Sequence, residues 1–127
     1  MAESRATLGT SRSGRFPHLV PITFAVVDQA IVTMIDNKPK TTTRLQRLVN
    51  IEADPQVTIL VDHYSNDWSK LWWVRFDCAA SISSEGPEWQ SAQRALVNRY
   101  GQYRESPPLG PAIIAIPESF VWWRGNQ

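Results

Sequence analysis

The sequence contains a single cysteine, Cys78, among its 127 residues. This number excludes an internal disulfide and zinc sites built from paired cysteines. Cys78 lies in a strand-like run, so we expect it to be part of the core rather than a nucleophile. The motifs CxxC, HExxH, GxGxxG, GxxxxGK[ST] and GxSxG are all missing, and the sequence therefore predicts no metal site, P-loop or serine hydrolase.

Long apolar runs are also absent, and none approaches the roughly 20 residues that a membrane-spanning helix needs. Charge is balanced, with 13 Lys and Arg against 12 Asp and Glu, so no positive field would attract nucleic acid. The polar N-terminus lacks the apolar core of a signal peptide, and we expect a cytoplasmic location. The remaining composition is that of one globular domain over residues 1–127, without a membrane or nucleic-acid partner.

Tryptophan, in contrast, is abundant, because the chain has six. Tryptophan is enriched at protein interfaces and on surfaces that stack flat ligands, so this excess favours a dimer or a flat aromatic ligand. The six residues are Trp68, Trp72, Trp73, Trp89, Trp122 and Trp123.

The order of the expected elements predicts an antiparallel barrel. Strands are expected at residues 5–10, 15–27, 31–35, 56–63, 71–83 and 112–116, and helices at about 41–54 and 87–100. Pro17 and Pro21 interrupt the second strand, which a central strand would not tolerate unless it bordered an edge, a bulge or a ligand. Six strands in hairpin order with two helices favour a mainly β (α+β) fold, a six-stranded antiparallel barrel, over a doubly wound sheet.

The most unusual stretch covers residues 33–50, where an apolar strand gives way to a basic helix. In a helix that starts near Thr41, Lys40, Arg44 and Arg47 share one face. Cations at a helix N-terminus oppose the macrodipole, typically at about 0.3 to 1 kcal/mol each, and a bound anion would remove that cost. First-turn N–H groups, threonine hydroxyls and ammonium groups would form a phosphate or carboxylate site. A solvated basic helix face is the alternative that the pattern leaves open.

These features together match a flat heteroaromatic cofactor that carries phosphate. Its ring would lie against the proline-interrupted strand, while Lys38, Lys40 and the threonines would hold the phosphate. The two histidines, His18 and His63, are far apart in sequence, so a metal site built on them is not expected, and each is interpreted as a hydrogen-bonding group.

Four segments also carry a family resemblance: GRFPHLVPITF, VTMIDNKPKTTTRLQRLVNIEADPQVTILVDHY, DWSKLWWVR and RYGQYRESPP. They resemble the split-β-barrel flavin and deazaflavin oxidoreductases of the pyridoxamine-5′-phosphate-oxidase-like superfamily, and within it the actinobacterial branch that uses coenzyme F420. The resemblance runs from about Leu8 to Pro111, and the helix-strand unit ending in NxxxDPxxxxLVD is its most specific part.

The resemblance implies a homodimer with two cofactor sites at the interface, a six-stranded split barrel of the FMN-binding type, and hydride transfer from reduced F420 to a small electron-poor organic substrate. The cofactor-binding residues that it implies are Thr33, Lys38, Lys40 and Thr41 for the phosphate, His18, Leu19 and Val20 for the strand that lines the ring, and Trp68 in a loop near the site. Arg44 and Arg47 would meet an acidic cofactor tail or lie on the surface.

The resemblance also leaves alternatives open. FMN in place of F420 would use the same phosphate site, and a non-catalytic split barrel would carry a cofactor or haem without turnover. The proton for the product would come from solvent, Lys70, Tyr64 or His63. Relatives usually carry a helix before the first strand, whereas here a strand is expected from Arg5, so either this helix is missing or the start lies upstream.

Overall fold

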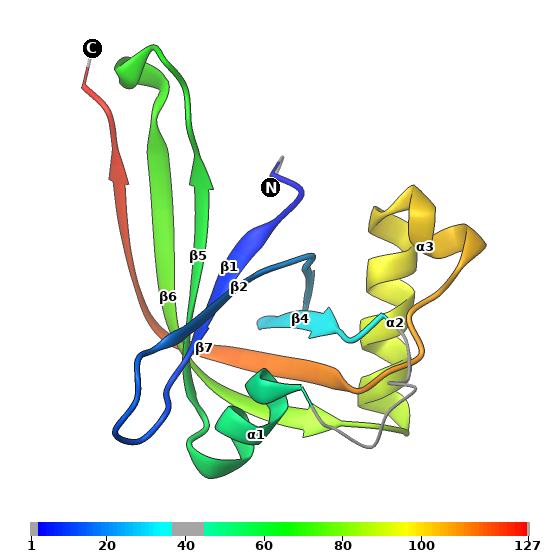
Figure 1. Ribbon diagram of the computed structural model, residues 1–127. Coiled ribbons are helices and arrows are strands. Elements are labelled where there is room, and N and C mark those ends of the chain that lie inside the picture. Colours follow the sequence, from blue (N-terminus) through cyan, green and yellow to red (C-terminus); the bar gives the residue numbers. More distant parts are fainter. Residues whose placement is uncertain (1–2, 37–44, 127) are drawn as a thin grey trace.

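The structure of the chain is a computed structural model that describes residues 3–36 and 45–126. The described residues form seven strands, three α-helices and one 3-10 helix (Figure 1). In chain order these are β1 (Ala6–Thr10), β2 (His18–Ile22), β3 (Ala25–Val27), β4 (Ala30–Met34), α1 (Gln46–Ala53), β5 (Gln56–His63), η1 (Trp68–Lys70), β6 (Trp72–Ser83), α2 (Pro87–Arg99), α3 (Gly101–Glu105) and β7 (Ala112–Arg124).

One antiparallel sheet contains all seven strands of the described residues, in the order β2-β1-β5-β6-β7-β4-β3. β2 and β3 stand at opposite edges, yet only Thr23 and Phe24 separate them along the chain. The sheet must therefore curl until its two edges meet, which makes a barrel. The expected mainly β split barrel is confirmed, with seven strands instead of six because the proline-interrupted segment 15–27 supplies both edges.

The two longest strands, β6 and β7, bend together at a bulge between Asp77 and Cys78. Figure 1 shows that one half of each strand lies in the barrel beside β4, while the other half projects with β5 as a long ribbon. The sequence prediction that the last strand ends at residue 116 is wrong. Residues 119–124 continue it, because they pair with residues 72–77 of β6 beyond the bulge.

The barrel interior holds the main hydrophobic core, in which Leu8, Phe24, Ile59 and Ile113 are almost completely buried. Cys78 belongs to this core. Burial raises the pKa of its thiol to about 11, and the nearby carboxylates act in the same direction. A thiol that stays protonated is a poor nucleophile, so the prediction of a core cysteine is confirmed.

A second, smaller core lies between α2 and the strands β3, β4 and β7, where Ala92 and Leu96 are fully buried. α2 begins at Pro87 as predicted, because proline is favoured in a first helical turn. The end of this helix lies one residue before the predicted position near residue 100. α2 ends at Arg99, an extended Tyr100 follows, and Gly101 begins α3. No helix within the described ranges is long and apolar enough to cross a membrane.

α1 begins five residues later than the sequence predicted, at Gln46 rather than near Thr41. Its N-cap residue, Leu45, is extended and packs against the main core. The preceding sequence contains a proline and three β-branched threonines, which are weak helix formers. Of the three cations predicted to share a helical face, Arg47 lies in α1, whereas Lys40 and Arg44 lie outside the described residues.

Candidate functional site

A cavity of about 300 Å³, here called the Thr33 cavity, lies where the break between β2 and β3 meets the end of β4. It is lined by Arg5, Pro21, Ile22, Thr23, Thr33, Met34, Ile35, Asp36, Arg47 and Tyr103. The proline-interrupted strand and Thr33, which the sequence assigned to the ring and the phosphate of one cofactor, thus border the same space. β2 and β4 lie toward opposite ends of the strand order, and curling of the sheet brings them together.

The charges around the Thr33 cavity favour an anion. Arg5 and Arg47 contribute two guanidinium groups, against the single carboxylate of Asp36. Burial lowers the pKa of Arg47, and Asp36 only partly offsets this effect. A half-buried guanidinium is stabilised by a charge-assisted partner, and two guanidinium groups beside threonine hydroxyls form a donor set that fits a phosphate.

Tyr103 of α3 forms one wall of the Thr33 cavity, and sequence reasoning did not single it out. Its hydroxyl donates a hydrogen bond to Asp36 Oδ1 (2.6 Å) and lies 2.8 Å from Thr23 Oγ1. Burial and the bond to Asp36 raise its pKa to about 12, so the phenol stays protonated at neutral pH. The only sequence signal was the segment RYGQYRESPP, which contributed to the family resemblance without a role for any tyrosine.

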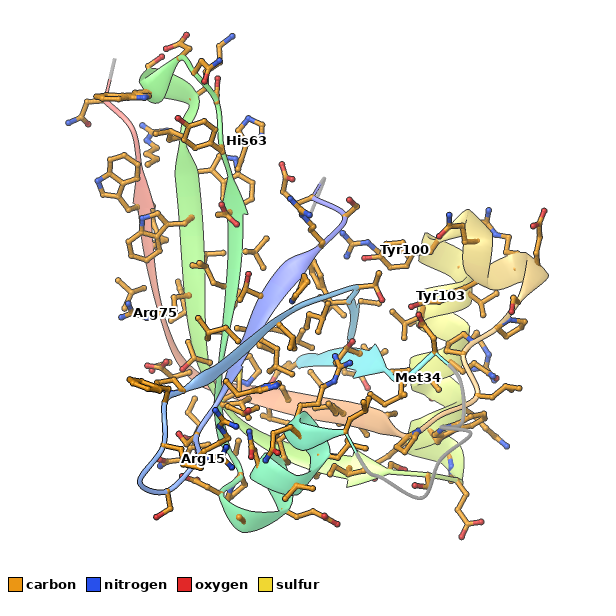
Figure 2. The ribbon with its side chains drawn as sticks, viewed as in Figure 1. Arg15, Met34, His63, Arg75, Tyr100 and Tyr103 are labelled. Atoms are coloured by element: carbon orange, nitrogen blue, oxygen red, sulfur yellow. The ribbon has the colours of Figure 1, made fainter. Side chains whose placement is uncertain are left out.

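Tyr100, which does not line the cavity, holds the break between β2 and β3. Its hydroxyl accepts a hydrogen bond from the Phe24 N–H (3.1 Å) and lies within 3.0 Å of the Phe24 carbonyl oxygen. The Arg99 guanidinium stacks on the Phe24 ring at 4.3 Å. These contacts satisfy the backbone where the sheet ladder stops and fix the wall formed by Thr23. Figure 2 shows Tyr100 and Tyr103 on the side where the helices face the barrel strands.

The three predicted ring-lining residues of β2 do not line the Thr33 cavity. Because side chains alternate along a strand, Leu19 points away from the barrel and is 66% exposed, beside a separate cavity of about 450 Å³. Val20 packs against the main core. His18 has a buried Nδ1 that finds no hydrogen-bond partner within the described residues.

Trp68 lies in η1, at the tip of the ribbon formed by β5 and β6, and is 72% exposed. Asp67 caps this short helix by accepting the Ser69 N–H (3.1 Å). Figure 1 shows the tip far from β4 and the helices α2 and α3. Within one chain, therefore, Trp68 and Thr33 do not meet. Four other predicted cofactor residues, Lys38, Lys40, Thr41 and Arg44, lie outside the described residues.

A profile of the pyridoxamine 5′-phosphate oxidase family matches residues 2–122 of the chain. The chain belongs to this family. No curated protein sequence matches the chain. A conserved hypothetical protein from Mycobacterium tuberculosis has the same fold, with 20% identity over 97% of this chain and 78% of that one and a TM-score of 0.78.

Two further solved structures show how varied the ligands of this pyridoxamine 5′-phosphate oxidase fold are. A haem storage protein from Vibrio cholerae is 17% identical over 98% of this chain and 87% of its own, with a TM-score of 0.74. An FAD-binding protein from Mycobacterium smegmatis is 15% identical over 98% of this chain and 87% of its own, with a TM-score of 0.69. At these identities the likeness shows the fold alone.

Proposed function

We propose that this protein is an F420-dependent oxidoreductase that reduces a small electron-poor organic substrate. The observation that carries the proposal is the Thr33 cavity, in which a proline-interrupted strand lies beside two arginines and two threonines. The preference for a deazaflavin comes from the sequence resemblance, since the segment at residues 32–64 resembles that of the F420 branch. FMN is the alternative cofactor for the same cavity.

Polar and strand residues of the cavity have separate roles in this proposal. Arg5 and Arg47, which line the cavity, would neutralise the cofactor phosphate, and the Thr33 hydroxyl would donate a hydrogen bond to it. The wall from Pro21 to Thr23 lies against the ring and excludes water, and Tyr103 holds that wall through its bond with Thr23. When bound, the reduced cofactor supplies a hydride. Lys38, Lys40 and Thr41 stay predicted ligands of the same phosphate.

Fluorescence titration tests the choice of cofactor. The protein is titrated with F420, with FMN, and with both in competition. We expect F420 to bind and FMN at equal concentration not to displace it. Micromolar binding of FMN without binding of F420 would refute the F420 proposal. A parallel absorbance titration with haem tests the hypothesis of a non-catalytic carrier. Haem binding without reduction of any acceptor would support that hypothesis over an oxidoreductase.

The Arg47→Gln variant tests the phosphate site. A charge-assisted hydrogen bond contributes about 1.5 to 3 kcal/mol, so we expect F420 affinity to fall roughly 10- to 100-fold. Arg94→Gln is the matched control, because Arg94 is exposed on α2 and does not line the cavity. Lys40→Ala is expected to weaken binding as well. If Arg47→Gln and Arg94→Gln bind equally well, the anion site is wrong.

We also propose that two copies of the chain form a homodimer through the projecting ribbon. The barrel half of β7 pairs with β4 at residues 112–115, whereas within the described chain the ribbon half pairs with β6 only. Phe120 and Trp122 on this half are 63% and 62% exposed. An unpaired sheet edge with large exposed apolar groups favours association. Such a dimer is what would bring Trp68 of one chain to the cofactor of the other.

Light scattering after size-exclusion chromatography tests the dimer. The wild-type protein is expected to have the mass of two chains, and Trp122→Lys the mass of one. Leu109→Lys is the control, because Leu109 is 57% exposed but lies in the linker before β7, away from the ribbon. A wild-type monomer, or a Trp122→Lys variant that stays dimeric, would exclude this interface.

A further inference from the structure

α2 covers only part of the sheet face on which it packs. On this face Val32 and Met34 of β4 and Ala112 and Ile114 of β7 belong to the smaller core, and Val32 pairs with Ile114. Because side chains alternate along a strand, Ile116 continues the row of Ala112 and Ile114. Ile116 is 55% exposed, whereas Ile114 is 7% exposed. The row of apolar side chains therefore runs beyond the part of the sheet that α2 covers.

A cavity of about 360 Å³, here called the Asp28 cavity, lies where the row leaves α2. It is lined by Val27, Asp28, Gln29, Ala30, Val32, Pro87, Glu88, Ser91, Ala92, Ile114 and Ile116. None of these residues lines the Thr33 cavity. Figure 1 shows α2 beside the barrel halves of the strands, on the side away from the projecting ribbon. The Asp28 cavity is thus a separate space of a size that suits a small molecule.

The charge of the Asp28 cavity is negative. Its two charged residues are Asp28 and Glu88, and among the described residues no cation lines it. Asp28 begins the two-residue turn between β3 and β4. Its φ of 53° lies in the left-handed region, which few side chains other than Asn and Asp adopt readily. Glu88 comes from the first turn of α2. Two carboxylates beside an apolar surface favour a ligand that is positively charged at one end.

The kind of cation follows from the other lining residues. No aromatic side chain lines the cavity within the described ranges, so a quaternary ammonium group would find no aromatic cage. A primary ammonium group instead donates three hydrogen bonds. The Ser91 hydroxyl and the Gln29 amide carbonyl lie in the cavity wall and add two acceptors to the carboxylates. Val32 and Ala92 are buried apolar residues that a hydrocarbon chain would contact.

We propose that the Asp28 cavity is a second ligand site, which binds a primary aliphatic amine. The hydrocarbon chain lies on the apolar row between α2 and the sheet, and the ammonium group pairs with the carboxylates of Asp28 and Glu88. The site takes a ligand of opposite charge to the anion of the Thr33 cavity and shares no residue with it. Amine binding therefore needs no bound cofactor.

Nuclear magnetic resonance of methyl-labelled isoleucines tests binding and its place. Hexylamine is the probe, because it is protonated at neutral pH as lysine is. We expect it to shift the methyl signals of Ile114 and Ile116, which line the Asp28 cavity. Ile22 and Ile35 line the Thr33 cavity, and their signals should not move. The variants Ile114→Val and Ile116→Val assign the first pair. No shift of that pair, or equal shifts of all four signals, would overturn the proposal.

Hexan-1-ol, which has the same chain without the charge, tests the role of the carboxylates. An exposed ion pair strengthens binding by up to about fivefold, so with two carboxylates the wild type should prefer hexylamine roughly 10-fold. The double variant Asp28→Asn, Glu88→Gln should bind both compounds about equally. Asparagine tolerates the left-handed conformation, so the turn is kept. Glu85→Gln is the control, because Glu85 is exposed just before α2 and does not line the cavity. A double variant that keeps the wild-type preference would show that the carboxylates do not bind the amine.

A second copy of the chain is the other occupant that an apolar surface could have, and Ile116→Lys separates it from an amine. The new side chain would place its own ammonium group at the cavity, so we expect hexylamine binding to be lost. Light scattering should give this variant the same mass as the wild type. A lower mass would show that the surface joins two copies, and the amine proposal would then be wrong. Should Ile116→Lys not fold, the comparison of hexylamine with hexan-1-ol in the double variant decides the question.

Discussion

Replacement of Gly110 by alanine should distort the wall of the Thr33 cavity from outside it. A Cβ atom at this position would lie 2.6 Å from the Ile35 carbonyl oxygen and 2.7 Å from the Ile35 Cβ atom. The backbones already meet closely, because Gly110 N–H donates to the Ile35 carbonyl at 3.0 Å and Leu109 N–H donates to the Asp36 carbonyl at 3.0 Å. Ile35 and Asp36 line the cavity. The segment around Gly110 can therefore move away only if it displaces these two residues or loses its hydrogen bonds to them.

The expected cost follows from those contacts. Overpacking in a closed position costs about 1 to 3 kcal/mol, and each lost backbone hydrogen bond adds roughly 1 kcal/mol. Alanine recovers about 0.4 to 1 kcal/mol because it restricts the unfolded chain. A net loss of about 2 kcal/mol is therefore expected, which corresponds to a fall in Tm of roughly 6 to 10 °C for a domain of this size.

Thermal unfolding followed by circular dichroism, with F420 titration of the folded variant, measures both effects. Gly101→Ala is the matched control, because the nearest atom to its added Cβ is the flexible end of Arg104 at 3.8 Å. We expect Gly101→Ala to keep the wild-type Tm and Gly110→Ala to lose F420 affinity as well as stability. Equal Tm values for the two variants would refute the close-packing argument.

Two further predictions concern stability. Burial raises the pKa of Cys78 from 9.0 to about 11 and that of Tyr103 from 10.0 to about 12. The unfolded chain therefore loses these two protons at a lower pH than the folded chain does. The free energy of unfolding should keep its full value below pH 9 and fall between pH 9 and 12. Urea denaturation across this range should show a shallower fall for Tyr103→Phe, and an unchanged slope would contradict the assignment. Asn50 is buried and donates to Thr10 Oγ1 (2.8 Å), so Asn50→Ala should cost about 1 to 3 kcal/mol by urea denaturation, of which Thr10→Val in the same chain should recover part. A cost below about 0.5 kcal/mol would show that this buried pair is replaceable.

Local sequence signals predicted the elements that depend on neighbouring residues. The strand at residues 56–63 is β-branched and apolar throughout its centre, and the helix at 87–99 follows a Gly-Pro start, and both were found where expected. The same local signals failed for α1, because the core takes up Leu45 and so sets where the helix begins. They failed again for β7, since only pairing with β6 keeps residues 119–124 extended.

The same distinction between local and tertiary information applies to the candidate site. The sequence by itself determined that a proline-interrupted strand, a strand threonine and a group of basic residues would be available for a phosphate-bearing cofactor, because hydroxyl groups, positive charges and a missing N–H belong to the residue types. Only the tertiary structure decided which of them share a space. Tyr103 and Asp36 are 67 positions apart in the chain and touch because the barrel closes against α2 and α3. Likewise Glu3 reaches His63, 60 positions away, because α2 holds the N-terminal segment in place.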